Sequence, residues 1–324
     1  MPKPDLLMTG PMMPLIADGL DKVFTVHRLH EASDREALLK KVAPSICAIC
    51  TGGHTGVKTD DAMMARFPGL KVIGNFGVGY DSIDVAAAAK RGVVVTNTPD
   101  VLTEEVADTT LGILLGTVRE FYQAEKWLRD GRWAREGDYR LTAASLRDRS
   151  VGIVGLGRIG KAIAKRCEAF GLPVSYFGRH KQADVSNRYY SDLVAMARDV
   201  DTLVVITPGG PGTNKLINAA VLQALGPRGI LINVSRGSVV DEEALIAALK
   251  NRTIMAAGLD VYAGEPNINP VFLTLDNVTL LPHVGSASVH TRDAMGQLVV
   301  DNLAAYVERK PPKTPVSETP FKGW

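Results

Sequence analysis

VGIVGLGRIGKAIAKRCEAFG, residues 151–171, places the glycines Gly155, Gly157 and Gly160 between an apolar strand and the start of an amphipathic helix. Glycines at this spacing let the backbone approach a pyrophosphate, and the N–H groups at the helix start stabilise its negative charge. A lone glycine motif is weak evidence, but here a second strand is also expected at 174–177. The stretch therefore predicts a dinucleotide-binding β-α-β unit rather than a turn whose glycines serve packing alone.

The end of that second strand indicates which dinucleotide is bound. A site for NAD needs a carboxylate there to bond the ribose hydroxyls, but the chain has Gly178 followed by Arg179, His180 and Lys181. A carboxylate would repel a 2′-phosphate, whereas glycine leaves room for it and the arginine fork can bind it. The sequence therefore predicts NADP(H) rather than NAD, the alternative being a solvated basic turn.

Short apolar segments alternate with helical segments through most of the chain, which is typical of parallel sheets built from β-α units. In the first part, strands are expected at 5–10, 23–29, 46–51, 71–75 and 93–97, and helices near 11–20, 32–42, 59–66 and 84–91. In the second part, strands are expected at 150–154, 174–177, 202–206, 230–234, 255–260 and 278–281, with a short one near 187–189, and helices at 158–170, 191–198, 218–225 and 241–250. Asp241 is a candidate N-cap for the last of these helices. Two longer helices are expected at 101–128 and 288–309.

These elements predict an α/β protein with two doubly wound parallel-sheet domains, one a Rossmann-type dinucleotide domain and one flavodoxin-like. Ligands are expected in a cleft between the domains. The simplest arrangement returns the C-terminal helix to the first domain. Residues 1–100 and 285–324 would then form a discontinuous substrate-binding domain, and residues 101–284 the dinucleotide-binding domain. The proline-rich tail 311–320 is expected to be a surface strap or a disordered end.

Composition argues against several classes of partner. The net charge is only +2 and no basic stripe is visible, so no nucleic-acid partner is expected. No segment is long and apolar enough to predict a membrane span, and the N-terminus does not read as a secretory signal. The 3 cysteines are too few for a disulfide framework and fit a reducing compartment, so a cytoplasmic location is expected. No metal site is expected.

Two of the cysteines, Cys47 and Cys50, form a C-x-x-C pattern. A redox pair needs its first cysteine at a helix N-terminus, where the thiolate is stabilised, but these two lie in an apolar run that reads as a strand. Residues three apart on a regular strand point to opposite faces. We therefore interpret both cysteines as buried packing residues.

Arg236, Glu265 and His283 each follow one of the last three expected strands. The carboxyl ends of parallel strands form the ligand crevice of an open sheet, so these side chains should converge there. Reduction of a 2-keto acid moves hydride to the carbonyl carbon while a proton reaches the oxygen. Histidine can donate that proton, a carboxylate favours its imidazolium form, and arginine can bind the substrate carboxylate. Each residue alone has a structural interpretation, but their common placement favours a catalytic group.

Several stretches resemble one known family along nearly the whole chain. They are NFGVGYD at 75–81, NTPD at 97–100, GLGRIG at 155–160, INVSRG at 232–237, GLDVYAGEP at 258–266 and LPHVGSAS at 281–288. The chain resembles the D-isomer-specific 2-hydroxyacid dehydrogenases, and within them most of all the NADPH-dependent glyoxylate/hydroxypyruvate reductases and the related hydroxyphenylpyruvate reductases. The resemblance implies NADPH-dependent reduction of small 2-keto acids to D-2-hydroxy acids by a homodimer, with residues 101–145 contributing to the interface.

The resemblance also implies individual roles. Arg236 would bind and polarise the substrate, and His283 would be the acid–base residue paired with Glu265. Backbone N–H groups of Val78 and Gly79 would hold the substrate carboxylate. The loop containing Gly53 and His54 would wall the substrate side chain, Asp260 would hold the nicotinamide amide, and Thr207 and Pro208 would line the cofactor. The cofactor contacts expected in total are Gly155, Leu156, Gly157, Arg158, Ile159, Gly160, Gly178, Arg179, His180, Thr207, Pro208, Thr213, Val234, Ser235, Arg236, Asp260, His283 and Gly285.

Alternative functions stay open at this level. His54 stands where members of the family vary, so the pocket could instead admit bulkier aromatic or branched 2-keto acids. A more distant alternative is a dinucleotide-sensing corepressor, because some relatives of this fold keep the same three polar residues. Turnover of a small keto acid would favour an enzyme.

Overall fold

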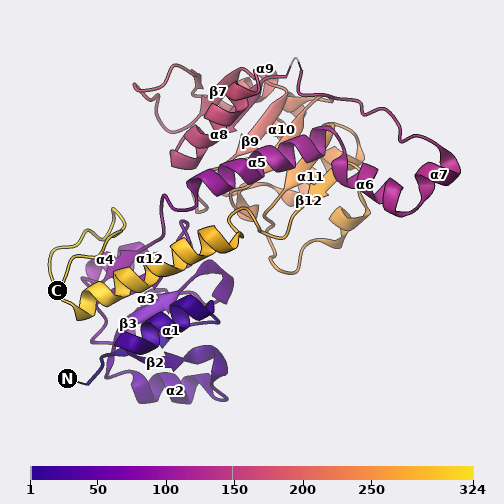
Figure 1. The fold of residues 1–324 in the computed structure, drawn as a ribbon. Helices are drawn as coiled ribbons and strands as arrows, with labels where there is room; N and C mark the ends of the chain where they lie inside the picture. The colour runs from indigo at the N-terminus through magenta and orange to yellow at the C-terminus, as the bar shows by residue number, and fades with distance from the viewer. Residues whose placement is uncertain (1, 148) are drawn as a thin grey trace. The chain divides into compact units, whose positions relative to one another are not determined.

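The computed structural model describes residues 2–147 and 149–324, which divide into two compact units (Figure 1). Unit 1 contains the residues up to Leu102 together with Ser288–Trp324, and unit 2 contains Thr103–Ala287. The boundaries expected from the sequence fall two residues earlier at the first junction and three earlier at the second. Each unit is an open, entirely parallel sheet with helices on both faces, as the alternating pattern predicted.

The sheet of unit 1 has the strand order β2-β1-β3-β4-β5. Its strands are β1 (Asp5–Met8), β2 (Thr25–Arg28), β3 (Ile46–Thr51), β4 (Val72–Asn75) and β5 (Val94–Thr96). Its helices are α1 (Pro14–Val23), α2 (Arg35–Val42), α3 (Asp61–Ala65), α4 (Val85–Lys90) and α12 (Val289–Val307). The three inner strands are buried on both faces, which explains their continuous apolar sequences.

Helices cover both faces of this sheet. On one face α1 and α12 lie side by side (Figure 1) and contribute Ile16, Leu20, Val299 and Leu303 to an apolar core. On the other face α2, α3 and α4 contribute Leu39, Met64 and Ala88 to a second core. Aspartate N-caps begin all three of these helices, which satisfies N–H groups at the helix starts.

The sheet of unit 2 has the strand order β12-β11-β10-β9-β6-β7-β8. Its strands are β6 (Val151–Val154), β7 (Val174–Phe177), β8 (Arg188–Tyr190), β9 (Thr202–Val205), β10 (Ile230–Asn233), β11 (Ala256–Leu259) and β12 (Val278–Leu280). Its helices are α5 (Thr103–Val118), α6 (Phe121–Arg129), α7 (Arg132–Glu136), α8 (Arg158–Ala169), α9 (Leu193–Asp199), α10 (Ala219–Leu225) and α11 (Glu242–Lys250). Helices α5 and α8 cover one face, and α9, α10 and α11 cover the other. The expected strands of both units lie within two residues of those observed, and Asp241 caps α11.

The single helix expected at 101–128 is wrong, because the chain turns at Glu120. That residue has a left-handed φ of 54° and separates α5 from α6. The turn brings the ring of Tyr122 against Gly116, where a Cβ would lie 2.8 Å from the ring. Tyr139 donates a hydrogen bond of 2.6 Å to the Glu120 carboxylate, which fixes the turn. Tyr139 lies outside the segment that was expected to be helical, so the periodicity of that segment could not indicate its contact with Glu120.

The interpretation of Cys47 and Cys50 as buried strand residues is confirmed, but their expected placement on opposite faces is wrong. Both lie in the core beneath α1 and α12, and both thiols are free. The pairing of β1 with β3 shifts register between Asp5 and Leu6, so an extra residue on β3 interrupts the alternation of faces. Burial raises the pKa of Cys50 to about 12, which keeps this thiol protonated and unreactive.

The proline-rich tail is a strap rather than a disordered end. Pro315 bridges antiparallel to Thr96, the Val316 N–H donates to the Val95 carbonyl, and the Thr319 hydroxyl accepts from the Val95 N–H at 2.9 Å. The tail thereby covers the outer edge of β5, whose N–H and C=O groups would otherwise be unpaired.

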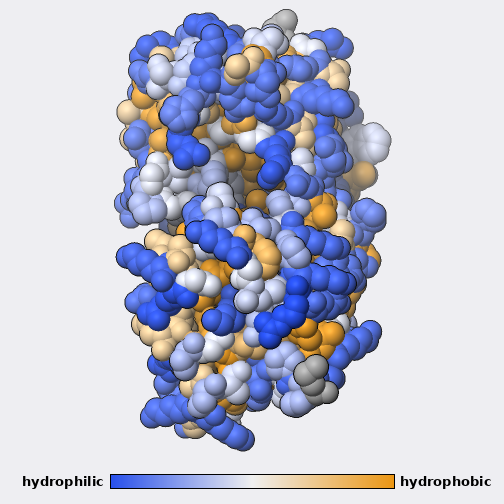
Figure 2. Space-filling model, turned by 90° about the vertical axis from the view of Figure 1, so that its left-hand side faces the viewer, coloured by the Kyte–Doolittle hydropathy of each residue, from blue (hydrophilic) through white to orange (hydrophobic). Residues whose placement is uncertain are grey.

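The surface view in Figure 2 shows a face in which polar residues predominate and apolar residues form small separate groups. Such a mixture is ordinary for a folded domain. Within residues 2–147 and 149–324, no helix combines the length and the apolar character needed to cross a bilayer.

Candidate active site

The glycine-rich turn joins β6 to α8 where the strand order of unit 2 reverses, which is where open α/β sheets bind ligands. Gly155 has a φ of 101°, and a Cβ there would lie 2.9 Å from Thr207. A Cβ on Gly160 would clash with the carbonyl of Gly155, so α8 can approach β6 only with glycine at this position. A Cβ on Gly157 would meet nothing within 4 Å. The turn is therefore tight toward the protein and open at Gly157, as close approach of a pyrophosphate requires.

The turn after β7 carries the exposed side chains of Arg179 and His180. Gly178 precedes them, and the hydroxyl of Tyr189 donates to its carbonyl at 3.2 Å. A Cβ on Gly178 would meet nothing within 4 Å. A site for NAD would need a carboxylate at this turn, but the turn instead has basic side chains and open space at Gly178. These residues fit the 2′-phosphate of NADP.

Gln182 fixes this basic turn to the glycine-rich turn and was not predicted. Its side-chain amide donates to the Leu156 carbonyl at 2.6 Å, and its backbone N–H donates to the hydroxyl of buried Tyr176 at 2.7 Å. Lys161 of α8 pairs with Asp184 at 2.7 Å just beyond. No local pattern marks Gln182, because its partners come from other parts of the β-α-β unit.

The segments after β9 and β10 carry further residues that were expected to contact the cofactor. Thr207 and Pro208 follow β9, and Val234 and Ser235 follow β10. The hydroxyl of Thr207 is buried and has no partner within the part of the chain that the structure describes. Thr213 closes this loop by donating to the Pro208 carbonyl at 2.7 Å. A buried, unpaired hydroxyl beside Gly155 fits a polar group of a bound dinucleotide.

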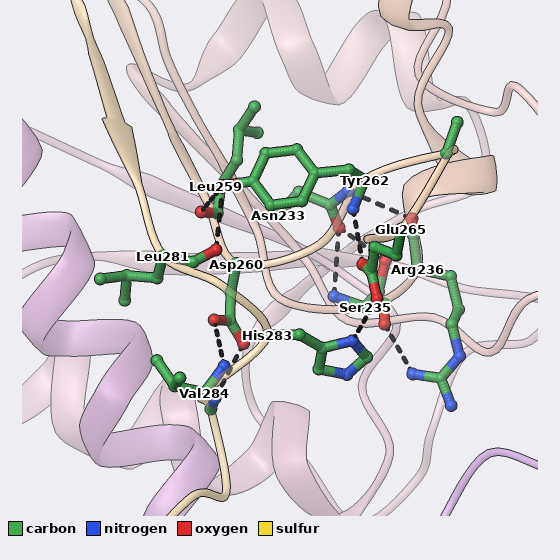
Figure 3. Close-up of polar contacts among 12 residues, drawn as sticks. Asn233, Ser235, Arg236, Leu259, Asp260, Tyr262, Glu265, Leu281, His283 and Val284 are labelled. Atoms are coloured by element: carbon green, nitrogen blue, oxygen red, sulfur yellow. Dashed lines mark hydrogen bonds and ion pairs between the residues drawn. The ribbon is translucent and has the colours of Figure 1, made fainter. Parts of the chain in front are cut away.

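His283 and Glu265 form a direct pair at the ends of β11 and β12. The Nδ1 atom of His283 lies 2.6 Å from Oε2 of Glu265 (Figure 3). A carboxylate only accepts hydrogen bonds, so Nδ1 carries the proton and Nε2 is left for a substrate. The Tyr262 N–H donates to Oε1 at 2.8 Å, which fixes the carboxylate from the other side. Burial by itself raises the pKa of Glu265, but the hydrogen bonds from His283 and Tyr262 and the charge of Arg236 outweigh it and lower the pKa overall.

Asp260 holds the loop that carries His283. Its two carboxylate oxygens accept hydrogen bonds from the N–H groups of Val284 at 2.7 Å and Gly285 at 2.8 Å. Its carbonyl accepts from the N–H of His283, whose φ of 54° is left-handed. Burial raises the pKa of Asp260 above its ordinary value, although these N–H groups oppose the shift. Asp260 therefore positions His283 through these hydrogen bonds, in addition to any contact with a cofactor amide.

Arg236 begins the short 3-10 turn after β10 and is brought beside Glu265 by close backbone packing. A Cβ on Gly237 would clash with the backbone of Tyr262, so glycine lets the two loops touch. The Arg236 guanidinium donates to the Ser235 carbonyl at 2.8 Å. Figure 3 shows the side chains of Arg236, Glu265 and His283 gathered beyond the strand ends. The convergence predicted for these residues is therefore present in unit 2.

In unit 1 the loop after β4 presents a row of backbone N–H groups. The Gly77 carbonyl accepts from the side-chain amide of Asn75 at 2.9 Å and from the Thr98 N–H at 3.0 Å. The Asn75 amide also donates to the Gly79 carbonyl at 3.0 Å, and Asn97 donates to the Val78 carbonyl at 2.9 Å. In a trans peptide the N–H points away from the carbonyl. Holding these carbonyls therefore turns the N–H groups of the following residues outward.

Those N–H groups belong to Val78, Gly79 and Tyr80, and none has an acceptor in the described ranges of the chain. Successive outward N–H groups form a nest that suits an anion such as a carboxylate. Val78 and Gly79 were expected to do this, whereas the roles of Asn75 and Asn97 were not predicted. Their signal was present in the stretches NFGVGYD and NTPD, where an asparagine stands close to the loop it supports.

The loop Gly53–Thr55 follows β3, the neighbour of β4 in the sheet of unit 1. A Cβ on Gly53 would meet nothing within 4 Å. The exposed imidazole of His54 stands edge-on to Phe76, with 5.8 Å between ring centroids. His54 therefore lies at the same sheet edge as the N–H row.

A glycine-rich dinucleotide turn at the switch point, with a paired histidine and glutamate and an arginine at neighbouring strand ends, defines a dinucleotide-dependent dehydrogenase. Residues 111–285 match the model of the D-isomer specific 2-hydroxyacid dehydrogenase, NAD binding domain. The chain belongs to this family.

Several known proteins are similar over nearly the full chain. An NADPH-dependent glyoxylate/hydroxypyruvate reductase from Sinorhizobium meliloti, solved in complex with NADP and malonate, is 51% identical, covers 98% of both chains and has a TM-score of 0.93. A hydroxyphenylpyruvate reductase of Plectranthus scutellarioides is 42% identical over 96% of this chain and 98% of its own. A 2-ketogluconate reductase of Gluconobacter oxydans is 41% identical over 97% of this chain and 99% of its own.

Proposed function

We propose that this protein is an NADPH-dependent reductase that converts small 2-keto acids, glyoxylate and hydroxypyruvate among them, to D-2-hydroxy acids. The observation that carries the proposal is the 2.6 Å pairing of His283 with Glu265, with the charge of Arg236 close to the same carboxylate. Similarity to the Sinorhizobium meliloti reductase over nearly the whole chain supports the choice of substrate and cofactor.

In this proposal the bound NADPH supplies the hydride. His283 donates the proton from Nε2 to the keto oxygen, while Glu265 orients the ring and stabilises its imidazolium form. Arg236 binds the substrate with its planar fork and polarises the keto oxygen. The N–H groups of Val78 and Gly79 hold the substrate carboxylate. The expected product is the D-hydroxy acid, as the family description states.

The decisive experiment measures NADPH oxidation with glyoxylate and hydroxypyruvate for the wild type and His283→Ala. Removing a general acid lowers the rate by about 10²–10⁴-fold, so we expect a loss of kcat of that size. His290→Ala, a change at another exposed histidine, is the control and should retain activity. Full activity of the His283 variant would refute the assigned role, and no turnover by the wild type would refute the function.

The preference for NADPH is assigned to Arg179. Losing an arginine–phosphate hydrogen bond of about 1.5–3 kcal/mol should lower the ratio of kcat/KM for NADPH over NADH by about 10–100-fold in Arg179→Ala. Arg198→Ala removes an exposed arginine elsewhere in unit 2 and should leave the ratio unchanged. A wild-type preference for NADH would contradict the assignment.

A second candidate function is the reduction of bulkier aromatic 2-keto acids, favoured by the similarity to the Plectranthus reductase. A panel of glyoxylate, hydroxypyruvate, hydroxyphenylpyruvate and 2-ketoisocaproate with NADPH separates the two. The substrate with the highest kcat/KM decides between them.

We further propose a homodimer whose interface includes residues 101–145. Within this segment Leu128 is 56% exposed and Trp133 is 57% exposed, and a partner that covers these side chains would remove their apolar surface from water. Trp133→Asp should give monomers in light scattering, whereas Leu273→Asp, at an exposed apolar residue of another segment, should not.

The free, buried thiols support a cytoplasmic location.

A further inference from the structure

The C-terminal strap, residues 311–320, makes two kinds of contact within unit 1 (yellow in Figure 1). Along the sheet edge, Val316 and Thr319 form hydrogen bonds with the backbone of β5. Two other strap residues, Thr314 and Glu318, instead contact residues of the loops that form and support the N–H row. Protection of a strand edge accounts for the first kind of contact but leaves the second unexplained.

Thr314 holds Asn97, the residue whose side chain supports the N–H row. The Thr314 hydroxyl donates to the Asn97 carbonyl at 2.6 Å, and the Asn97 N–H donates to the Thr314 carbonyl at 3.3 Å. With its backbone bonded on both sides, Asn97 directs its side-chain amide to the Val78 carbonyl, at 2.9 Å. Because a trans peptide points its N–H away from its carbonyl, this bond turns the Gly79 N–H outward.

Asn302 of α12 fixes the direction of each bond to Thr314. The backbone N–H of Thr314 can only donate, so it faces Oδ1 of buried Asn302, at 3.0 Å. The other end of the amide, Nδ2, then donates to the Thr314 hydroxyl at 2.7 Å. The hydroxyl accepts this bond and has its own proton left for the Asn97 carbonyl. An ordered chain of hydrogen bonds therefore runs from α12 through the strap to the N–H row.

Glu318 holds the far end of the same row. The hydroxyl of Tyr80 lies 3.2 Å from each carboxylate oxygen of the exposed Glu318. Burial and the charge of Glu318 raise the pKa of Tyr80, so the hydroxyl keeps its proton and donates to the carboxylate. Tyr80 also carries the last N–H of the row. The strap therefore restrains the row from two positions.

We propose that the C-terminal strap is a positioning element for substrate binding, in which Thr314 and Glu318 keep the N–H row in the orientation that receives the substrate carboxylate. This inference rests on the proposed function and adds Thr314 as a positioning residue that acts on the substrate through Asn97. Such a residue controls binding rather than chemistry. Losing an interaction that is equally strong in the ground state and the transition state raises KM and leaves kcat unchanged.

The test measures KM and kcat for glyoxylate with saturating NADPH. Thr314→Val keeps the shape of the side chain but removes the hydroxyl, so the KM should rise about 3–10-fold, as expected for a lost neutral hydrogen bond. The kcat should stay within about twofold of the wild type. Thr314→Ser keeps the hydroxyl and should restore the wild-type KM. Thr319→Val is the matched control, because it removes a buried strap hydroxyl whose bonds both go to β5.

A double-mutant cycle separates positioning from a general loosening of the strap. In Asn97→Leu the bond to the Val78 carbonyl is already lost, so adding Thr314→Val should change the KM by less than about twofold. Glu318→Ala changes an exposed side chain, which folding tolerates, and frees the hydroxyl of Tyr80. It should raise the KM about 2–5-fold, the range expected for an exposed charged contact.

An unchanged KM in Thr314→Val, or an equal rise in Thr319→Val, would overturn the inference while leaving the proposed function intact, provided that the wild type reduces glyoxylate. Effects of Thr314→Val and Asn97→Leu that multiply in the double variant would also overturn it. If Thr314→Val does not fold, an unchanged KM in Glu318→Ala is the result that overturns it. Absence of any 2-keto acid reduction by the wild type would refute the proposed function, and the inference with it.

Discussion

Replacing Asn97 by leucine tests how a side chain outside direct contact with substrate can control anion binding. The Asn97 amide donates to the Val78 carbonyl at 2.9 Å, and this bond turns the Gly79 N–H outward. Leucine has a similar volume and cannot donate. With the Val78 carbonyl released, the peptide between Val78 and Gly79 can rotate, and the nest loses one of its N–H groups.

The size of the effect follows from one lost hydrogen bond to a charged group, about 1.5–3 kcal/mol. Such a loss weakens binding by about 10–100-fold. We therefore expect the KM for glyoxylate and the Kd for oxamate, a non-reducible analogue, to rise by that factor in Asn97→Leu. The Kd for NADPH should not change, because the cofactor turn lies in unit 2.

The assay combines steady-state kinetics with calorimetric titration of oxamate onto the NADPH-loaded enzyme. Asn277→Leu is the matched control, since its side-chain amide also donates to backbone carbonyls, at 3.0 and 3.2 Å, and is also half-buried. Both variants should lose stability, but only Asn97→Leu should lose oxamate affinity. Equal oxamate affinity in the two variants would refute the link between Asn97 and the nest.

Three further predictions concern unit 2. The pKa of Glu265 is lower in the folded protein than in the unfolded chain, where it is about 4.3. Its ionised carboxylate therefore stabilises the fold at a pH above about 4.3, and this stabilisation is lost as the pH falls through the folded-state pKa. In chemical denaturation below pH about 5, the unfolding free energy of Glu265→Gln should therefore fall less with decreasing pH than that of the wild type. The difference should be less than about 1 kcal/mol, because the Glu265 side chain is 33% exposed. Gln182→Met removes the bond to the Leu156 carbonyl and should lower the NADPH-to-NADH ratio of kcat/KM by about 3–10-fold, and an unchanged ratio would show that this bond does not position the basic turn. Arg149 is 4% exposed and donates to two backbone carbonyls, so Arg149→Met should lower the unfolding free energy by about 2–4 kcal/mol, measured by urea titration, with kcat unaffected.

The sequence by itself determined the alternation of strands and helices and, from it, the parallel sheets. It could do so because continuous apolar strands, glycine turns and helical periodicity are local signals that each segment carries alone. It also predicted that Arg236, Glu265 and His283 would converge, because the ends of parallel strands share one edge of a sheet. The same reasoning predicted that Arg179 faces the 2′-phosphate and that Gly178 stands where an NAD site would need a carboxylate.

Only the tertiary structure decided the features that depend on partners distant in sequence. The break at Glu120 depends on Tyr139, 19 positions further along the chain, and the helical periodicity of the segment does not reveal this contact. The shared face of Cys47 and Cys50 depends on a register shift against β1. Asn97 and Gln182 have positioning roles because hydrogen bonds depend on distance and direction, and residues 19 and 26 positions apart become neighbours only once the chain has folded.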